Sequence, residues 1–270
     1  MNPKKRLDLI LTERGYFNSR EQAKAAVMAG RVFVNGERVD KPGTVLPLDV
    51  EIKFLGKEHP YVSRGGLKLE KAIKEFNLDF AGKAVLDVGA STGGFTHCSL
   101  IYGAGCVTAI DVGYGQLAWE LRTDPRVHLF ERTNIRYVTP EKLNCLSDIA
   151  VIDVSFISLE KVLPAVFNLL KERGIIVALV KPQFEAGPAK VGKKGVVRDK
   201  EVHIEVLLKT VAFGKSIGLA AEMLTYSPIR GPEGNIEYII KFLTDRNNAL
   251  IDVQNIRQVV EKAHSTLERS

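Results

Sequence analysis

Short apolar runs alternate with longer helical stretches through most of the chain. Runs of strand length predict seven β-strands, at residues 84–88, 105–111, 127–130, 148–154, 174–180, 219–226 and 236–243. The intervening segments predict helices at 67–76, 95–102, 116–122, 158–171 and 200–217. Strands that alternate with helices favour a doubly wound α/β sheet. A loop rich in Pro and Gly joins the last two strands without a helix, so we expect the last strand to run antiparallel.

The first 55 residues follow a different pattern. Ser19 and Gln22 have the spacing of a capping box at a helix start, and Asn35-Gly36 between two short runs is a strong hairpin signal. The pattern predicts helices at 6–14 and 20–29 and strands at 32–34, 37–39 and 50–54. We therefore expect a small α+β domain at 1–56, a polar linker at 57–62 and the α/β domain at 63–270.

Charge adds a candidate partner to this picture. The net charge is +6, and the excess is concentrated in two regions. Residues 1–75 hold fifteen Lys and Arg against ten Asp and Glu, and residues 181–200 hold six against two. Local basic regions favour a polyanionic partner, nucleic acid first, although solubility alone is an alternative explanation.

Composition also excludes several classes of protein. The longest apolar run, 175–180, is far too short to span a membrane, and acidic Asp8 interrupts the N-terminal stretch where a signal peptide needs its apolar core. Cys98, Cys106 and Cys145 have neither metal-ligand nor disulfide-framework spacing. We expect a cytoplasmic protein without a metal or a membrane partner.

A Gly-rich turn follows the first strand of the α/β domain, where such folds bind nucleoside cofactors. Its spacing differs from the dinucleotide fingerprint, and it is not the phosphate-binding P-loop of nucleoside triphosphatases, because no Gly-Lys-Ser/Thr follows. Asp111 ends the next strand 22 positions after Gly89, which suits a carboxylate that binds a ribose hydroxyl. The combination favours S-adenosylmethionine, with an ordinary strand–helix turn as the alternative. The predicted cofactor residues are Gly89, Ala90, Ser91, Thr92, Gly93, Gly94, Phe95, Asp111, Asn134 (toward the adenine edge) and Asp153.

Four charged residues from distant segments should meet beside this turn. Asp153 and Lys181 end parallel strands, and Glu237 lies near the start of the antiparallel strand, which places it at the same edge. Lys68 lies in the helix before the first strand. Methyl transfer to a hydroxyl requires removal of its proton, a task for such a group of lysines and carboxylates. Taken singly, each residue also fits an exposed surface charge.

Several basic residues lie where they can reach RNA phosphates, at helix ends or in exposed loops. A basic loop at 186–200 is a hypothetical flap over a flipped nucleotide. The predicted RNA-binding residues are Arg6, Arg20, Lys24, Arg31, Arg64, Arg132, Arg136, Lys190, Lys193 and Lys194.

The motifs also resemble known families. RLD, SREQA and AGRVFVNG, in this order, resemble the S-four RNA-binding domain, which implies binding to structured RNA. Lys68, Asp153, Lys181 and Glu237 resemble the catalytic tetrad of FtsJ-type 2′-O-methyltransferases. With SRGGLKL, DVGASTGGFT, DVGYGQLAW, DVSFISL, KPQFE and GNIEY, the whole chain is similar to the TlyA (hemolysin A-like) rRNA methyltransferases.

The resemblance implies a Rossmann-like, seven-stranded methyltransferase sheet behind an S-four-like domain. It implies 2′-O-methylation of cytidine in ribosomal RNA by S-adenosylmethionine, on one or both ribosomal subunits, with Lys181 most central. A non-catalytic ribosome-assembly factor, and a membrane-lytic protein as the hemolysin name suggests, are the alternatives. A pseudouridine synthase with an S-four domain would not need the Gly-rich turn. The sequence leaves the target nucleotide and the oligomeric state open.

Overall fold

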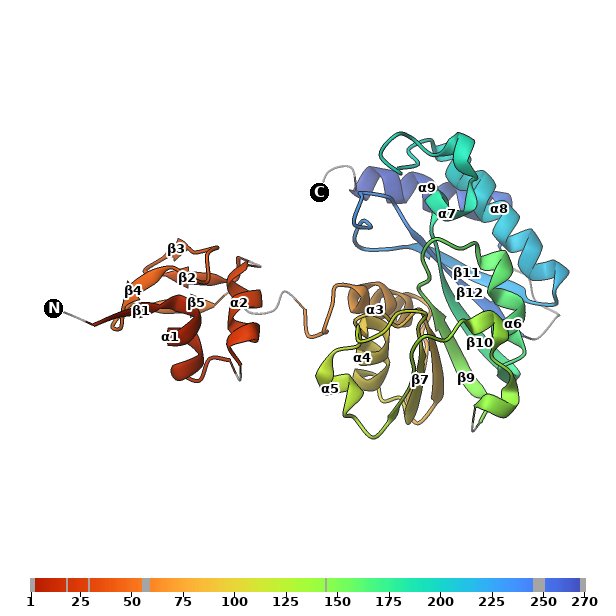
Figure 1. Ribbon diagram of the computed structural model, residues 1–270. Helices are drawn as coiled ribbons and strands as arrows, with labels where there is room; N and C mark the ends of the chain where they lie inside the picture. The colour runs from red at the N-terminus through yellow and green to blue at the C-terminus, as the bar shows by residue number, and fades with distance from the viewer. Residues whose placement is uncertain are drawn as a thin grey trace. The chain divides into compact units, whose positions relative to one another are not determined.

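The computed structural model describes residues 3–17, 19–28, 30–54, 59–143, 145–244 and 251–267. The chain divides into two compact units, residues 1–60 and residues 61–270, each with its own core (Figure 1). The expected linker at 57–62 lies partly outside the described residues.

The N-terminal unit packs two helices against short antiparallel strands. The helices are α1 (Leu7–Glu13) and α2 (Arg20–Met28), and the strands are β1 (Lys4–Arg6), β2 (Val32–Val34), β3 (Glu37–Arg38), β4 (Val45–Pro47) and β5 (Ile52–Phe54). β2 pairs with β3 and β5, and β1 pairs with β4. Leu7, Leu11 and Val27 are fully buried in the core between helices and strands.

Local sequence explains most of this unit. Asn35 and Gly36 both have positive φ, as the predicted tight hairpin requires. The Gln22 amide donates to Ser19 Oγ over 3.2 Å, which confirms the predicted cap. The prediction missed β1 and β4, because each has three residues and β1 is Lys-Lys-Arg, with no apolar alternation to reveal it.

The C-terminal unit contains the predicted seven-stranded sheet, in the order β11-β12-β10-β9-β6-β7-β8. Its strands are β6 (Ala84–Val88), β7 (Cys106–Ile110), β8 (Val127–Phe130), β9 (Ser147–Ile152), β10 (Leu170–Val180), β11 (Ala220–Tyr226) and β12 (Tyr238–Leu243). β12 is antiparallel to both of its neighbours, whereas the pairs from β10 to β8 are parallel. The predicted antiparallel last strand is therefore confirmed.

Helices cover both faces of this sheet (Figure 1). Along β9, Ile149 and Val151 face one core while Ala150 and Ile152 face the other, as expected for a strand buried on both sides. One face packs against α3 (Gly65–Glu75), α4 (Gly94–Ile101) and α5 (Trp119–Arg122), and the other against α6 (Leu163–Phe167), α8 (Lys200–Ser216) and α9 (Val253–Leu267).

The helix predicted at 158–171 is wrong in extent. The segment forms a 3₁₀ turn at Leu159–Lys161 and then α6, and β10 already begins at Leu170. Pro164 explains the break, because its ring excludes a continuous helix through the preceding turn and suits only the first turn of a new one. The helix predicted at 116–122 is likewise reduced to α5.

Short helical turns and one long helix complete the unit. The short turns are Ile135–Tyr137, Pro140–Lys142, α7 (Pro182–Glu185) and Pro188–Lys190, the last within the predicted loop. The prediction missed α9, although Ile256, Val260, Ala263 and Leu267 form a buried stripe of helical period.

Candidate functional site

The Gly-rich turn after β6 is tied to the end of β7. Asp111 Oδ2 accepts a hydrogen bond from the Ser91 amide at 2.7 Å, and its Oδ1 accepts one from the Gly113 amide at 2.6 Å. Gly89 has φ of +85°, and a Cβ there would lie 2.6 Å from the Asp153 carbonyl oxygen. Glycine is therefore required for the turn to pass this close to the neighbouring strand end.

A buried acid lies directly beneath this turn. Asp87 on β6 is fully buried, and its Oδ2 accepts a hydrogen bond from Thr96 Oγ1 of α4 at 2.6 Å. Its Oδ1 is buried without a hydrogen-bond partner among the described residues. Burial, together with the charges of Asp153 and Asp111, raises the pKa of Asp87 to about 7.

The structure brings the four predicted charged residues together in a chain of alternating charge. Lys68 Nζ lies 2.6 Å from Glu237 Oε2 and 3.9 Å from Asp153 Oδ2. Lys181 Nζ lies 2.6 Å from Asp153 Oδ1. Lys68, Lys181 and Glu237 are almost completely buried. Buried charges of this kind are stable only when they are paired, and each member here has an opposite charge beside it.

The strand ends explain the convergence. Asp153 follows β9, Lys181 follows β10, and Glu237 directly precedes the antiparallel β12. Lys68 comes from the first turns of α3, which starts two residues earlier than predicted.

Sequence reasoning missed two residues at this edge. Ser155 Oγ accepts a hydrogen bond from Lys181 Nζ at 3.0 Å. Phe156 is 90% exposed with φ of +62°, and its ring centroid lies 5.0 Å from that of Phe184. They lie two and three residues after Asp153 in the motif DVSF, so their position after a strand end was the available signal.

Two cavities meet at the turn. One of about 320 Å³ contains the four charged residues and the Gly-rich turn, and is also lined by the loop at 229–232. The other, of about 420 Å³, has a more apolar wall that includes Ile110, Val112, Ile135 and Ile157 together with the side chains of Asp111 and Asn134. Gly89, Ser91, Asp153 and Ser155 line both cavities, so the two spaces share one wall.

Gly231 allows Glu237 to reach Lys68. A Cβ on Gly231 would lie 2.7 Å from Glu237 Oε1, and Glu237 is too buried to move away freely. If the four charged residues are catalytic, as the sequence predicts, we expect Gly231→Ala to turn this carboxylate away from Lys68 and to lower turnover about 10-fold or more, because misplacement of reacting groups is costly. Pro232→Ala, in the same loop, is the control. Turnover equal to that of the control would show that the position of Glu237 does not matter.

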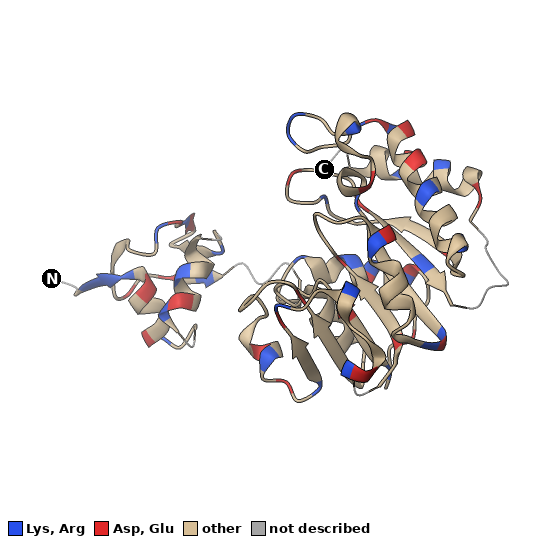
Figure 2. Ribbon diagram, turned by 45° about the vertical axis from the view of Figure 1, so that its right-hand side comes forward, with Lys and Arg blue, Asp and Glu red and all other residues tan. Residues whose placement is uncertain are grey.

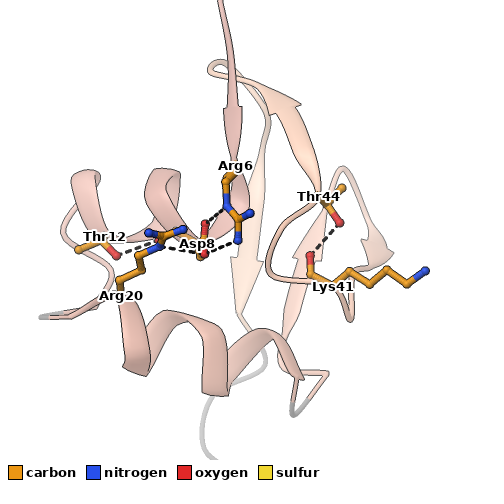
Figure 3. A network of polar contacts seen from close by, with 6 residues as sticks. All are labelled: Arg6, Asp8, Thr12, Arg20, Lys41 and Thr44. Carbon is orange, nitrogen blue, oxygen red and sulfur yellow. Dashed lines mark hydrogen bonds and ion pairs between the residues drawn. The ribbon is translucent and has the colours of Figure 1, made fainter.

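In the N-terminal unit the structure brings Arg6 and Arg20 together at one buried carboxylate (Figure 3). Asp8 Oδ2 lies 2.9 Å from Arg6 Nη2 and 3.0 Å from Arg20 Nε, and Asp8 Oδ1 accepts a further bond from Arg6 Nε at 3.0 Å. The two guanidinium groups are about half exposed while Asp8 is fully buried. Asp8 therefore fixes two cationic groups at the surface, in an orientation available to an anionic ligand.

The same contacts predict an acid-sensitive contribution to stability. Hydrogen bonds from Arg6 and Arg20 lower the pKa of Asp8 to about 2, from an unfolded value of about 3.9. The contribution is complete above about pH 4 and is lost as the pH falls through 2. We expect Asp8→Asn to cost about 1 kcal/mol at pH 7, a figure reduced for the exposure of both arginines. Faster hydrogen exchange of the α1 amides in Asp8→Asn would measure this loss of stability. Exchange rates equal to those of the wild type would contradict the prediction.

The other predicted RNA-binding residues have varied surroundings. Arg64 lines the cavity with the four charged residues. Arg132 lies over the Tyr114 ring, 4.2 Å from its centroid, and Arg136 lies over that of Tyr137 at 5.4 Å. The remaining ones are distributed as follows: Lys24 and Arg31 are half-buried, Lys190 forms an ion pair with Glu205 of α8, and Lys193 and Lys194 are exposed. Figure 2 shows that β1 is basic along its whole length.

Within the described ranges, none of the helices is long and apolar enough to cross a membrane. These ranges also hold no group of three or more His, Cys, Asp or Glu side chains arranged to bind a metal ion.

The sheet, the turn and the four charged residues define the class of protein. The FtsJ-like methyltransferase model matches residues 61–243, and the S4 domain model matches residues 5–52. The chain belongs to the TlyA family, whose members join an S4 domain to an FtsJ-like methyltransferase domain. The predicted family and fold class are thereby confirmed.

Related proteins match this chain over nearly its whole length. The 16S/23S rRNA (cytidine-2′-O)-methyltransferase TlyA of Mycobacterium tuberculosis is 42% identical over 96% of this chain and 97% of that protein. A candidate rRNA methyltransferase of Bacillus subtilis, YqxC, is 48% identical over 98% and 96%. A solved structure of a candidate hemolysin from Streptococcus thermophilus has a TM-score of 0.79, with 45% identity over 100% of this chain and 98% of that one.

Proposed function

We propose that this protein transfers a methyl group from S-adenosylmethionine to the 2′-hydroxyl of a cytidine in ribosomal RNA. The observation that carries the proposal is the cluster of Lys68, Asp153, Lys181 and Glu237 in a cavity that shares a wall with a nucleoside-sized cavity. The names of its relatives supply the substrate class.

The residues of the second cavity fit the cofactor. A volume of about 420 Å³ with a largely apolar wall is typical of a small-molecule site. Asp111 would accept the ribose hydroxyls, since its carboxylate keeps lone pairs beyond the two bonds from Ser91 and Gly113. Asn134 Oδ1 already accepts from the Arg136 amide, so the Asn134 side chain would meet the adenine through its NH₂ group. When bound, the cofactor would supply an electrophilic methyl group.

Within the cluster, Lys181 is the group best placed to act on a substrate hydroxyl. Its ammonium is held by Asp153 Oδ1 and Ser155 Oγ, at the wall that faces the second cavity. To accept the hydroxyl proton, Lys181 must first lose its own, and Asp153 fixes its position in either state. Lys68 and Glu237 would act as positioning residues, because Lys68 shares Asp153 with Lys181 and is itself held by Glu237.

RNA binding is assigned to both units. In the N-terminal unit, Arg6 and Arg20 on Asp8 would bind phosphates of folded rRNA, with Lys24 and Arg31 as further candidates. In the methyltransferase unit, the exposed Phe156 offers a base-stacking surface. Its ring lies 5.0 Å from that of Phe184, over which Lys181 Nζ lies at 6.0 Å. The loop at 186–200 remains our proposed flap. Its Lys193 and Lys194 are exposed, whereas Lys190 is occupied by Glu205.

The test is transfer of tritiated methyl groups to isolated small and large ribosomal subunits from a strain that lacks the protein. We expect label in rRNA that nuclease digestion recovers as 2′-O-methylcytidine, on at least one subunit. Folded protein that binds S-adenosylmethionine but labels neither subunit would overturn the proposal and favour a non-catalytic assembly factor. Leakage from liposomes mixed with the purified protein would instead favour a membrane-lytic activity.

A further inference from the structure

A third cavity, distinct from the proposed cofactor cavity, lies beside the one that holds the four charged residues. It has a volume of about 320 Å³. Its walls come from the end of the loop before α8, from the loop before β12 and from α9: Val196, Val197, Arg198, Arg230, Glu233, Gly234, Ile236 and His264. Arg230 lines both this cavity and the one with the charged cluster, so its side chain borders both.

Arg230 forms no ion pair with a carboxylate of the described residues. Its Nε and Nη2 donate to the Leu267 carbonyl at 3.1 and 2.7 Å, and its Nη1 donates to the Gly234 carbonyl at 3.3 Å. Carbonyl oxygens are neutral acceptors, so these bonds orient the guanidinium without neutralising its positive charge. Arg257 of α9 is different, because it is paired with the Glu201 carboxylate at 2.9 Å. Arg230 is thus a fixed cation at the rim of the proposed active site.

Arg198 is exposed, but its backbone is held in place. The amide of the preceding residue, Val197, donates to Asn235 Oδ1 at 3.0 Å, and the Val197 carbonyl lies 3.0 Å from His203 Nε2. Asn235 Nδ2 also donates to the Gly195 carbonyl at 2.8 Å. The segment that carries Arg198 is therefore anchored to the loop that carries Arg230 and to α8. The two arginines are presented to one cavity by rigid backbone.

We propose that Arg198 and Arg230 bind the RNA phosphate group on the 3′ side of the methylated ribose. This inference rests on the proposed function and deepens it. The 2′ and 3′ carbons of ribose are bonded to each other, so a ribose whose 2′-hydroxyl meets Lys181 carries its 3′ phosphate close by. Arg230 lines the same cavity as Lys181, and it also lines the neighbouring cavity. Guanidinium groups suit phosphate because they donate two parallel hydrogen bonds.

Three variants test the inference, and we expect them to weaken rRNA binding, to tighten it and to leave it unchanged, respectively. Arg198→Ala should raise the Kd for isolated rRNA and the KM for ribosomal subunits about 5-fold, and reduce the salt slope of binding by about one. Glu233→Gln removes a carboxylate from the same cavity, so it should tighten binding about 2-fold. Arg173→Ala is the control, because Arg173 is exposed near the start of β10, opposite the strand ends that form the site. Kd for S-adenosylmethionine should be unchanged in all three.

The outcomes separate this inference from the proposed function. If Arg198→Ala and Arg173→Ala have the same rRNA affinity and the same salt slope, the phosphate site is wrong even where the wild type methylates RNA. If the wild type transfers no methyl group, but Arg198→Ala still weakens rRNA binding and lowers the slope, the phosphate site stands and the proposed reaction falls. Arg198→Lys keeps the charge and should restore most of the affinity.

Discussion

Replacement of Lys181 by Met is expected to lower kcat for rRNA methylation by about 10³-fold, with the Kd for S-adenosylmethionine changed less than about 3-fold. Lys181 Nζ is the buried nitrogen that lies between Asp153 Oδ1 at 2.6 Å and Ser155 Oγ at 3.0 Å, at the wall that faces the proposed cofactor cavity. Methionine keeps the length and the apolar stem of the side chain but can neither hold nor accept a proton. Single-turnover methyl transfer to ribosomal subunits measures the effect.

Two further lysines make this result interpretable. Lys171→Met changes the same residue type at the opposite end of β10, where Lys171 pairs with Asp148, and it should leave turnover within about 2-fold of the wild type. Lys68→Met should lower stability as well as turnover, because it leaves the buried Glu237 without its 2.6 Å partner, at a cost of about 3–5 kcal/mol. If Lys181→Met retained a tenth or more of the wild-type kcat, proton removal by this lysine would be excluded.

The sequence alone could predict that the charged residues of the site meet, because the topology of the sheet determines where its strand ends lie. Strand ends in an open parallel sheet meet at one edge, so Asp153 and Lys181 could be placed there from the positions of two apolar runs alone. The placement of Glu237 required one more inference. Because no helix joins the last two strands, the last strand was expected to run antiparallel, and β12 does so. Their pairing, with Glu237 on Lys68 and Asp153 on Lys181, could not be predicted, because it depends on side-chain distances of a few ångströms.

What the sequence left unseen depends on contacts between distant segments. Arg230 is unremarkable in a loop rich in Pro and Gly, and only its position between two cavities gives it a candidate role. Asp8 looked like an ordinary helix residue, yet its burial makes it the anchor of two arginines that had been predicted as RNA contacts. The segment at 158–171 was misjudged because its apolar spacing fits a helix, whereas a single proline, Pro164, decides where the helix starts.

The second large effect concerns Asp87, the buried acid beneath the Gly-rich turn. Its folded-state pKa is about 7, because burial disfavours the carboxylate and the charges of Asp153 and Asp111 add to that penalty. In the unfolded chain an aspartate has a pKa of about 3.9. The folded state therefore holds a proton between about pH 4 and pH 7 that the unfolded state has lost. Stability is highest below pH 4 on this account, and it falls as the pH rises to 7.

The folded and unfolded pKa values of Asp87 differ by about three units, which corresponds to a loss of stability of at most about 4 kcal/mol. Relaxation of the protein around the buried charge reduces this loss. We expect Asp87→Asn to lack this fall in stability with rising pH, because an amide stays neutral. At pH 8 the variant should be about 2 kcal/mol more stable than the ligand-free wild type, since its amide oxygen can still accept the hydrogen bond from Thr96 Oγ1. Denaturant unfolding of both proteins at pH 5 and pH 8 measures the difference. Asp8 does not interfere, because its contribution changes only below pH 4.

A residue that destabilises the protein at neutral pH calls for a functional reason, and the position of Asp87 offers one. The carboxylate lies under the turn where a positively charged cofactor is proposed to bind, with Oδ1 buried and without a hydrogen-bond partner among the described residues. A bound cation would favour the ionised form, so binding should release a proton from Asp87 below pH 7. Calorimetry of S-adenosylmethionine binding at pH 6, in buffers with different ionisation enthalpies, should detect this proton in the wild type and not in Asp87→Asn. Equal proton release by both proteins would assign the buried acid a purely structural role.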